Sequence, residues 1–506
     1  MKRARSAAPA TTTQSRWWSR VSSFAVAALA CALIVRLIPQ AGRAKLFSDE
    51  CFHAYLAEWI GGHWRLPDRL PEFYGGLWYS YPPLLHALGA VWLKLFGASG
   101  IVELNVLLFA LLLAALAFLP VPGIASTPRR WAALLCVANA WLASYAVRFF
   151  AEMLISLLGL VLVVLVLRYY RSERMRDALL AGVVTGLALL AKQTALVLPV
   201  LLVVLAAASA LARRPARASG LALAALIGAA IAVPFLIRNV QLYGSPIYPA
   251  FARDVDPDLL RLYRMQPGYS LLTYLSKCVQ AFGPYVLILA LAALALAGFR
   301  RRGDLVVAIL VLCPIGAALN YLSPLHDARH IIPLIPVTAL FASIVIYDAL
   351  RARPEFVAVV EAALLVLATV TVLRLPDIRK PFDVLWYLPP AYAAASSIVP
   401  KDATILSLFT YDTFYYTRRR ATWPLAWGPS ARLAALFREK DPERFLAAAR
   451  RNGIDYLLID RFPGPEEFLG SNYNRSFGEC VTALLREGKV RMAWISPDMA
   501  LVAVNP

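Results

Sequence analysis

The chain has 506 residues, of which 60% are hydrophobic and only 16% are charged, and its formal net charge is +20. An ordinary soluble domain carries about 25% charged residues, so this composition excludes that class. Apolar runs long enough to cross a bilayer recur, and basic residues cluster in the short turns between them. This pattern favours a multi-pass membrane protein over a nucleic-acid-binding one.

The basic N-terminal segment, residues 1–20, leads into the first apolar run at residues 21–39. A cleaved signal peptide would begin in the same way. Because the run is long and more apolar runs follow, we interpret it as an uncleaved signal anchor with a cytoplasmic N-terminal segment.

Eleven membrane spans are predicted. They cover residues 21–39, 101–120, 131–147, 153–170, 178–191, 194–212, 219–236, 284–299, 304–321, 331–349 and 355–374. With the N-terminus inside, every cytoplasmic turn is basic, as the positive-inside rule requires. The apolar segment 82–97 is short and begins with two prolines, so we interpret it as a helix in the outer interface. A short true span is the alternative, but it would break the charge pattern.

The extracytoplasmic side then receives a first loop (40–100), a second loop (237–283), the turn 323–330 and the tail from 376. All five histidines fall on this side. They are His53, His63, His86, His326 and His330. Polar groups gathered at span ends on one face indicate a site that opens to that side.

The tail, residues 376–506, changes character. DATILSLFTYD and GIDYLLID have strand patterns, VRMAWISPDMALVAV predicts two strands joined at residues 496–498, and helical patterns lie within 430–452. We expect a small extracytoplasmic α/β domain here, without a catalytic motif. Residues 21–375 form the transmembrane domain.

Two adjacent carboxylates, Asp49 and Glu50, follow the first span. Ser48 is a plausible N-cap, so these acids could simply favour a helix start. His53 lies one turn after Asp49. That spacing suits a general base, a divalent cation or neither.

Aromatic residues crowd the same loop. They include Trp64, Tyr74, Trp78, Tyr79 and Tyr81. Flat rings beside carboxylates suit a sugar, although an aromatic belt at the interface would look the same.

Charged groups recur at later outer span ends. Arg148 and Glu152 are four residues apart and could form a silent ion pair, or Glu152 could be a second acidic member of the site. Lys192 lies between two apolar spans, where a cation needs an anionic partner such as phosphate or must snorkel to the interface.

Two further segments carry cations. Arg238 ends a span before a Gly/Pro-rich turn, and His326, Arg329 and His330 lie in SPLHDARHIIP. Lys192, Arg238 and Arg329 could converge on one anionic group, for which the arginine fork is well suited.

The order of these motifs resembles the GT-C glycosyltransferases, and most nearly the branch of protein O-mannosyltransferases and lipid A aminoarabinose transferases. The matching segments are S-D-E at 48–50, Y-x-Y-P-P-L at 79–84, R-x-x-x-E at 148–152, A-K at 191–192, R-N…Y-G-S-P-I-Y-P at 238–249 and H-D-A-R-H…P at 326–333. The resemblance covers about the first 340 residues.

The resemblance implies an inverting transfer from a polyprenyl-phosphate sugar, with Asp49 as the base and cations stabilising the leaving phosphate. Glu152 stands where the family often has Asp. Tyr81 stands where the family often has Lys or His, and it cannot neutralise a phosphate.

We therefore expect a glycosyltransferase of the bacterial inner membrane, acting on a hydroxyl of a protein, lipid or glycan, with membrane lipids but no nucleic acid as partners. The expected catalytic residues are Asp49, Glu50 and Glu152. The expected substrate-binding residues are His53, Trp78, Tyr79, Tyr81, Arg148, Lys192, Arg238, His326, Arg329 and His330. No cofactor is firmly indicated, but Asp49, Glu50 and His53, with His326, could ligate Mg²⁺ or Mn²⁺.

Two alternatives remain open. A transporter or flippase of a lipid-linked sugar would also need many spans, but such proteins place charges near the midplane and carry inverted repeats, which this chain lacks. A membrane scaffold that presents the tail leaves the loop carboxylates unexplained.

Overall fold

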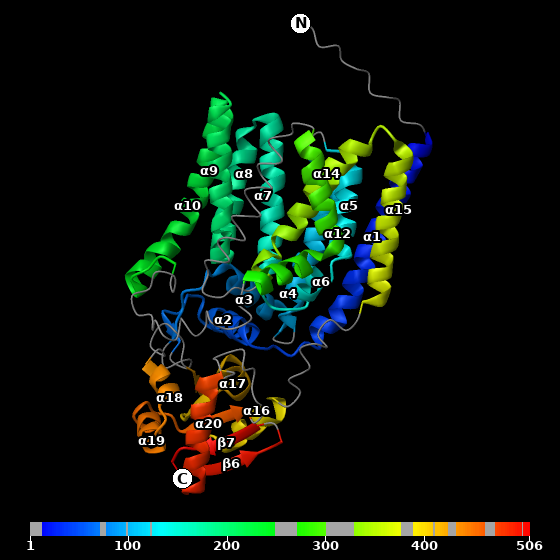
Figure 1. The fold of residues 1–506 in the computed structure, drawn as a ribbon. Coiled ribbons are helices and arrows are strands. Elements are labelled where there is room, and N and C mark those ends of the chain that lie inside the picture. The colour runs from blue at the N-terminus through cyan, green and yellow to red at the C-terminus, as the bar shows by residue number, and fades with distance from the viewer. Residues whose placement is uncertain are drawn as a thin grey trace.

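The computed structural model describes residues 13–70, 77–97, 100–121, 124–247, 271–299, 328–375, 388–407, 410–423, 432–460, 471–497 and 499–505. A bundle of apolar helices forms one part and a smaller α/β unit the other, and the start of α1 and the strand β7 lie at opposite ends of the molecule (Figure 1).

The bundle contains helices from both halves of the chain. They are α1 (Thr13–Gly42), α4 (Glu103–Phe118), α5 (Ser126–Val137), α6 (Ala140–Ala146), α7 (Glu152–Ser172), α8 (Met175–Ala191), α9 (Val197–Leu211), α10 (Pro215–Tyr243), α12 (Leu271–Phe299), α14 (Leu334–Leu350) and α15 (Pro354–Arg374). Within the described residues, six stretches are long and apolar enough to cross a membrane. The chain is therefore a multi-pass membrane protein. The predicted span 304–321 lies outside the described residues, and the total of eleven stays a prediction.

One predicted span is wrong in detail. Residues 131–147 were expected as a single helix, but α5 ends at Val137 and α6 begins at Ala140. Asn139 causes the break because its side chain accepts a hydrogen bond from the Leu142 N–H and so caps a new helix. Its amide also donates to the backbone carbonyls of Ala281 and Phe282, which ties this break to α12.

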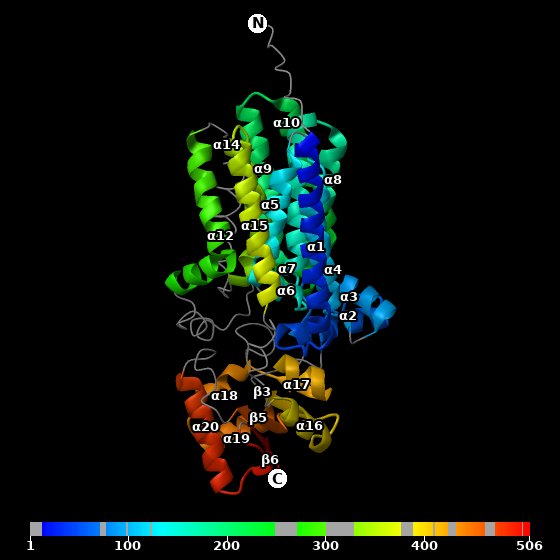
Figure 2. The same cartoon turned by 90° about the vertical axis from the view of Figure 1, so that its right-hand side faces the viewer.

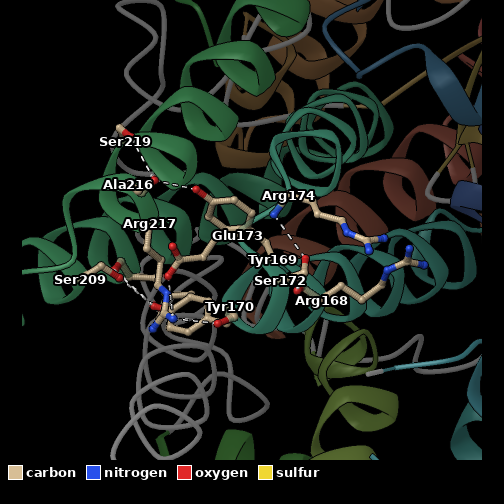
Figure 3. Close-up of polar contacts among 11 residues, drawn as sticks. Arg168, Tyr169, Tyr170, Ser172, Glu173, Arg174, Ser209, Ala216, Arg217 and Ser219 are labelled. Atoms are coloured by element: carbon tan, nitrogen blue, oxygen red, sulfur yellow. Dashed lines mark hydrogen bonds and ion pairs between the residues drawn. The ribbon is translucent and has the colours of Figure 1, made fainter. Parts of the chain in front are cut away.

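The turns between α7 and α8 and between α9 and α10 lie at the end of the bundle where α1 begins (Figures 1 and 2). Polar contacts join these two turns (Figure 3). The Tyr169 hydroxyl donates to the Ala216 carbonyl at 2.7 Å, and Arg217 pairs with Glu173 at 3.1 Å. Both are among the basic turns that the charge pattern predicts on the same side of the membrane.

Helices α8 and α10 pack at close range because small residues line their contact. A Cβ added at Gly186 would lie 2.6 Å from the Cβ of Ile231, and one at Gly182 would lie 2.8 Å from the Cβ of Ile227. Small residues four positions apart allow membrane helices to approach closely in this way.

A buried ion pair joins α1, α5 and α15. Arg130 donates through Nε to Glu361 Oε1 at 2.9 Å, and the Ser22 hydroxyl donates to the same oxygen. Both charged side chains are at most 3% exposed.

The first loop lies at the opposite end of the bundle from the basic turns (Figure 2). It contains α2 (Asp49–His63), β1 (Arg69–Leu70), β2 (Leu77–Trp78) and α3 (Leu84–Phe96). Helix α3 is the segment expected at the interface. It packs on α2 around Gly89 and Ala57 and exposes Leu95 and Phe96, as an amphipathic interfacial helix would.

The tail forms a five-stranded sheet with flanking helices. Its elements are α16 (Leu388–Ile398), β3 (Thr404–Ser407), α17 (Thr410–Thr417), β4 (Arg420–Thr422), α18 (Ala434–Arg438), α19 (Pro442–Arg451), β5 (Tyr456–Asp460), α20 (Ser471–Arg486), β6 (Arg491–Ile495) and β7 (Met499–Ala503). The strand order is β4-β3-β5-β7-β6, with β3 parallel to β4 and β5, and β7 antiparallel to β5 and β6. The strands predicted within 453–460 and 490–504 are confirmed. The strand predicted for residues 402–412 is too long, because β3 ends at Ser407 and residues from Thr410 onward form α17.

The first loop and the tail share one hydrophobic core. Phe52 and Leu56 of α2 belong to the same buried cluster as Leu406, Phe414 and Leu457 of the tail. Helix α2 is therefore packed between the bundle and the α/β unit, and both parts fix its position.

Candidate active site

Four charged side chains from separate parts of the chain meet at the bundle end that carries the first loop. Asp49 opens α2, Glu152 opens α7, Lys192 follows α8, and Arg329 lies in the short 3-10 helix η4 (Ala328–Ile331). Arg329 Nη2 lies 2.8 Å from Asp49 Oδ2, and Arg329 Nε lies 3.9 Å from Glu152 Oε1. Lys192 Nζ pairs with the same Glu152 oxygen. Two carboxylates and two cations thus form one continuous ionic cluster.

The two carboxylates of this cluster differ in their exposure to solvent. The Asp49 side chain is 29% exposed, whereas the Glu152 side chain is 1% exposed. The second oxygen of Glu152, Oε2, is buried and makes no hydrogen bond with the described part of the chain. Glu152 is therefore placed to balance the cations from beneath, and Asp49 is the member of the pair that an incoming group can reach.

Glu50 has a different environment from its neighbour. Its carboxylate is buried, and Oε1 accepts a hydrogen bond from the Phe149 N–H at 3.0 Å. Asn105 holds the same turn from the other side by donating to the carbonyls of Arg148 and Phe150. Glu50 thereby fixes α2 against the turn that precedes α7.

Arg148 contacts aromatic rings. Its guanidinium lies over the rings of Tyr145 and Phe150, at 5.5 and 5.4 Å from their centroids. Glu152, the partner that the spacing allowed, pairs with Lys192 and Arg329. The guanidinium of Arg329 also lies over the Phe150 ring, at 5.1 Å.

A buried chain of hydrogen bonds runs behind Asp49. His53 Nδ1 lies 2.8 Å from His86 Nε2, and His86 Nδ1 lies 3.0 Å from the Tyr79 hydroxyl. We assign the phenol as the donor, so His86 carries its proton on Nε2 and His53 carries its proton on its own Nε2. Burial lowers the pKa of His53 to about 3, with Arg329 and Lys192 adding to the decrease. Burial also lowers the pKa of His86, so both rings are neutral at physiological pH.

Tyr81 and His330 lie beside the ionic cluster. Tyr81 packs edge-on against His53 and remains 38% exposed. Partial burial raises the pKa of its hydroxyl, and the Asp49 carboxylate adds to this rise. Burial lowers the pKa of His330, and the charges of Lys192 and Arg329 act in the same direction.

Arg238 contacts the first loop. It donates to the carbonyls of Tyr79 and Pro67, at 3.1 and 2.6 Å, and pairs with Asp68. Trp78 lies in β2, opposite Arg69 of β1. His326, the remaining predicted site residue, lies outside the described residues.

The structure corrects the expected role of Ser48. Ser48 precedes α2 as predicted, but its side chain makes no capping hydrogen bond. Its backbone has φ 55° and ψ −126°, outside the β-region that an N-cap needs. Its N–H instead donates to Asp412 Oδ1 in the tail, at 2.9 Å. Sequence reasoning missed Asp412, because this residue lies 364 positions after Ser48.

The residues proposed as metal ligands have other partners. Asp49 pairs with Arg329, Glu50 accepts from the Phe149 N–H, and His53 contacts His86. Over the described ranges, no three His, Cys, Asp or Glu side chains are grouped as a metal ion would need. The arrangement does not fit a divalent ion at Asp49, Glu50 and His53.

Comparisons with known proteins agree with this architecture. A profile for a domain of unknown function (DUF8201) matches residues 79–258. No curated protein sequence matches the chain. Solved structures with a similar fold include the oligosaccharyltransferase AglB from Archaeoglobus fulgidus in complex with an inhibitory peptide and a dolichol-phosphate (TM-score 0.63, 12% identity, covering 89% of this chain and 70% of that chain).

ArnT from Cupriavidus metallidurans is similar over almost its whole length. Its apo structure has a TM-score of 0.63 at 13% identity and covers 97% of this chain and 98% of that chain. Its structure bound to undecaprenyl phosphate has a TM-score of 0.59 at 14% identity and covers 95% and 97%. At these identities the likeness establishes the fold, and the GT-C fold expected from the motifs is confirmed.

Proposed function

We propose that the chain is a membrane glycosyltransferase. It moves a sugar from a polyprenyl-phosphate donor to a hydroxyl acceptor at the extracytoplasmic face of the bacterial inner membrane. The observation that carries the proposal is the ionic cluster, in which the accessible Asp49 carboxylate lies 2.8 Å from Arg329, beside Glu152 and Lys192. The similar folds whose solved structures hold dolichol-phosphate or undecaprenyl phosphate support a lipid-phosphate donor.

The orientation follows from charge. The turns that carry Arg168, Arg174 and Arg217 lie at one end of the bundle, and the ionic cluster lies with the first loop near the other (Figure 1). The positive-inside rule assigns the basic end to the cytoplasm, so the site faces the extracytoplasmic side.

The reaction uses Asp49 as the general base. Asp49 takes the proton of the acceptor hydroxyl while that oxygen forms a bond to the anomeric carbon from the face opposite the phosphate. The bond between the anomeric carbon and the phosphate oxygen breaks, and its electron pair leaves with the lipid phosphate. The anomeric configuration is therefore inverted.

Lys192 and Arg329 stabilise the departing phosphate. Charge grows on the phosphate oxygen as the bond breaks, and fixed cations in a partly buried site stabilise such charge strongly. Carboxylates balance both cations before the donor arrives. A bound phosphate competes with Asp49 for Arg329, so donor binding would also release the base from its ion pair.

The remaining predicted residues divide into sugar contacts and supports. Tyr81 and His53 lie beside Asp49 and can contact the sugar through a ring face and a ring N–H. Tyr79 is fully buried and fixes the proton on His86, so it supports His53 from behind. Arg238 shapes the first loop through its carbonyl contacts. No step of this scheme passes through a metal ion.

The test is the Asp49→Asn variant, which keeps the shape of the side chain and removes the base. Purified protein is given a panel of polyprenyl-phosphate sugars, and mass spectrometry measures the released lipid phosphate. We expect transfer to be lost while donor binding is retained. Asp402→Asn, an exposed carboxylate of the tail, is the matched control and should transfer normally.

Two outcomes would contradict the proposal. Transfer by Asp49→Asn at the wild-type rate would remove Asp49 as the base. Movement of intact lipid-linked sugar across a vesicle bilayer, with no lipid phosphate released from any donor, would favour a flippase instead.

A further inference from the structure

The turn that presents Asp49 has an unfavourable backbone conformation. Glu50 N–H donates to the Phe47 carbonyl at 3.1 Å and closes a four-residue turn, with Ser48 and Asp49 as its central residues. Ser48 has φ 55° and ψ −126°, the conformation of the first central residue of a type II′ turn. Glycine is preferred there, and another residue keeps this conformation only where its surroundings impose it.

The tail supplies contacts that impose it. Asp412 Oδ1 accepts the hydrogen bond of the Ser48 N–H at 2.9 Å, and the Tyr416 hydroxyl donates to the Leu46 carbonyl at 2.7 Å. Phe47 packs against the buried tail cluster that contains Ile405 and Leu458. Three consecutive residues before Asp49 are therefore held by one side of the α/β unit.

Both tail residues belong to α17, and this helix also lies against α2. Arg418, directly after α17, pairs with Glu58 at 2.9 Å, and the Tyr415 hydroxyl donates to Glu58 at 3.1 Å. The rings of Tyr411 and Phe52 lie 4.7 Å apart. The contact thus extends from the start of α2 to its middle and fixes how the two helices are aligned.

Burying Asp412 to accept the hydrogen bond of the Ser48 N–H costs free energy. Its side chain is buried, and a buried carboxylate is unfavourable unless polar partners compensate it. Its partners include the Ser48 N–H and the Cys51 thiol, which lies 3.8 Å away. A purely structural position in this core would be filled at lower cost by an apolar residue.

We propose that α17 is a positioning element for the active site: Asp412 and Tyr416 hold the strained Phe47–Glu50 turn and so direct the Asp49 carboxylate toward Arg329. Asp412 and Tyr416 are positioning residues and touch no substrate. The inference rests on the proposed function only in giving Asp49 its chemical role. It gives the tail a function, because without α17 the turn would relax to a conformation that serine prefers.

The test measures the turn directly, by hydrogen–deuterium exchange of the full-length protein. We expect Asp412→Ala to speed exchange in peptides covering residues 44–52 by about tenfold, the effect of losing one buried hydrogen bond. Exchange in β5 and β7 should change less than about twofold, since the sheet keeps its own ladder. Asp412→Asn keeps an acceptor oxygen and should restore slow exchange.

Tyr416→Phe provides the second variant in case Asp412→Ala disturbs the tail. It removes one hydroxyl from a partly exposed ring and should speed exchange in 44–52 by about threefold or more, with β5 and β7 unchanged. Tyr415→Phe is the matched control, because this neighbouring hydroxyl contacts Glu58 and not the turn. It should leave exchange in 44–52 at the wild-type rate.

Turnover separates positioning from a general loss of fold. In Asp412→Ala we expect kcat to fall about tenfold while the KM for the lipid-linked donor changes less than about threefold, with Asp412→Asn restoring kcat. Unchanged exchange in 44–52 in both Asp412→Ala and Tyr416→Phe would overturn the inference, as would an Asn variant as impaired as the Ala variant. Exchange needs no substrate, so its result stands apart from the Asp49→Asn test of the proposed function.

Discussion

The buried ion pair between Arg130 and Glu361 allows a quantitative prediction about stability. Arg130 contacts Glu361 Oε1 through two nitrogens, each at 2.9 Å, and both side chains are at most 3% exposed. Within the described residues, Arg130→Met would leave the Glu361 carboxylate with a hydrogen bond from the Ser22 hydroxyl. Removing one partner of a buried ion pair costs about 3–5 kcal/mol, because the other charge stays buried without compensation.

The neighbouring Arg129 provides a matched control. Its guanidinium donates to the Leu119 carbonyl at 2.8 Å, near the end of α4. The Arg129→Met variant loses the same number of atoms and the same charge, but it should cost only about 1 kcal/mol, the net value of an ordinary hydrogen bond. Unfolding of both variants, followed in detergent by heat or denaturant, measures the difference.

The double variant Arg130→Met/Glu361→Met completes the cycle. Replacing a buried ion pair by apolar side chains is often neutral, so we expect stability within about 2 kcal/mol of wild type. Independent effects of the two single changes would instead add to roughly 6–10 kcal/mol. A double variant as unstable as that sum, or an Arg130→Met protein no less stable than Arg129→Met, would refute the ion pair as the link between α1, α5 and α15.

Three further predictions concern packing, pH and the cations of the site. Gly186→Ala should destabilise the protein by about 1–3 kcal/mol, because the new Cβ would lie 2.6 Å from the Cβ of Ile231. Gly159→Ala is the control, because its Cβ would meet nothing within 4 Å, and thermal unfolding distinguishes the two variants. Burial depresses the pKa of His53 in the folded state to about 3, below its ordinary value of 6.5. Between these two values the unfolded chain binds more protons than the folded chain. The free energy of unfolding should therefore fall as the pH drops from about 6.5 toward 3. His53→Gln should weaken this dependence of the free energy of unfolding on pH, and His63→Gln, at an exposed position, should not. If the free energy of unfolding changes with pH equally in both variants, His53 does not cause the dependence. Lys192→Met and Arg329→Met should each lower kcat by about 10²–10³, measured as lipid phosphate released, while a change confined to KM would contradict their role in stabilising the leaving group.

Hydropathy predicted the helices well because the bilayer imposes a fixed length and polarity on any spanning segment. It could not distinguish Arg129 from Arg130, since both stand in the same basic turn. Which of the two enters the bundle depends on Glu361, a residue more than 200 positions later. The break at Asn139 was open to prediction from its capping side chain, but the apolar run around it concealed the signal.

The charged residues of the site could be predicted from their position at span ends. Residues whose role depends on contacts with distant parts of the chain could not. Charges at span ends are costly without partners, so Asp49, Glu152, Lys192 and Arg329 could be selected from sequence, and the fold brings them together. Arg238 met the same criterion and contacts the first loop instead. Asp412 met none of the criteria, because its importance depends on the conformation of Ser48.

The three carboxylates near the site show why residue type alone does not assign a base. Asp49 and Glu50 are adjacent, so about 100° of helical rotation separates their side chains and only one can face outward. Glu50 faces inward, and a backbone N–H occupies one of its oxygens. Glu152 is buried against Lys192, so a proton placed on it would weaken its ion pair with that cation. Of these three carboxylates, Asp49 alone is both exposed and paired with a cation, Arg329, that an incoming phosphate can attract. Loss of that ion pair as the donor binds would leave the Asp49 carboxylate available to accept a proton.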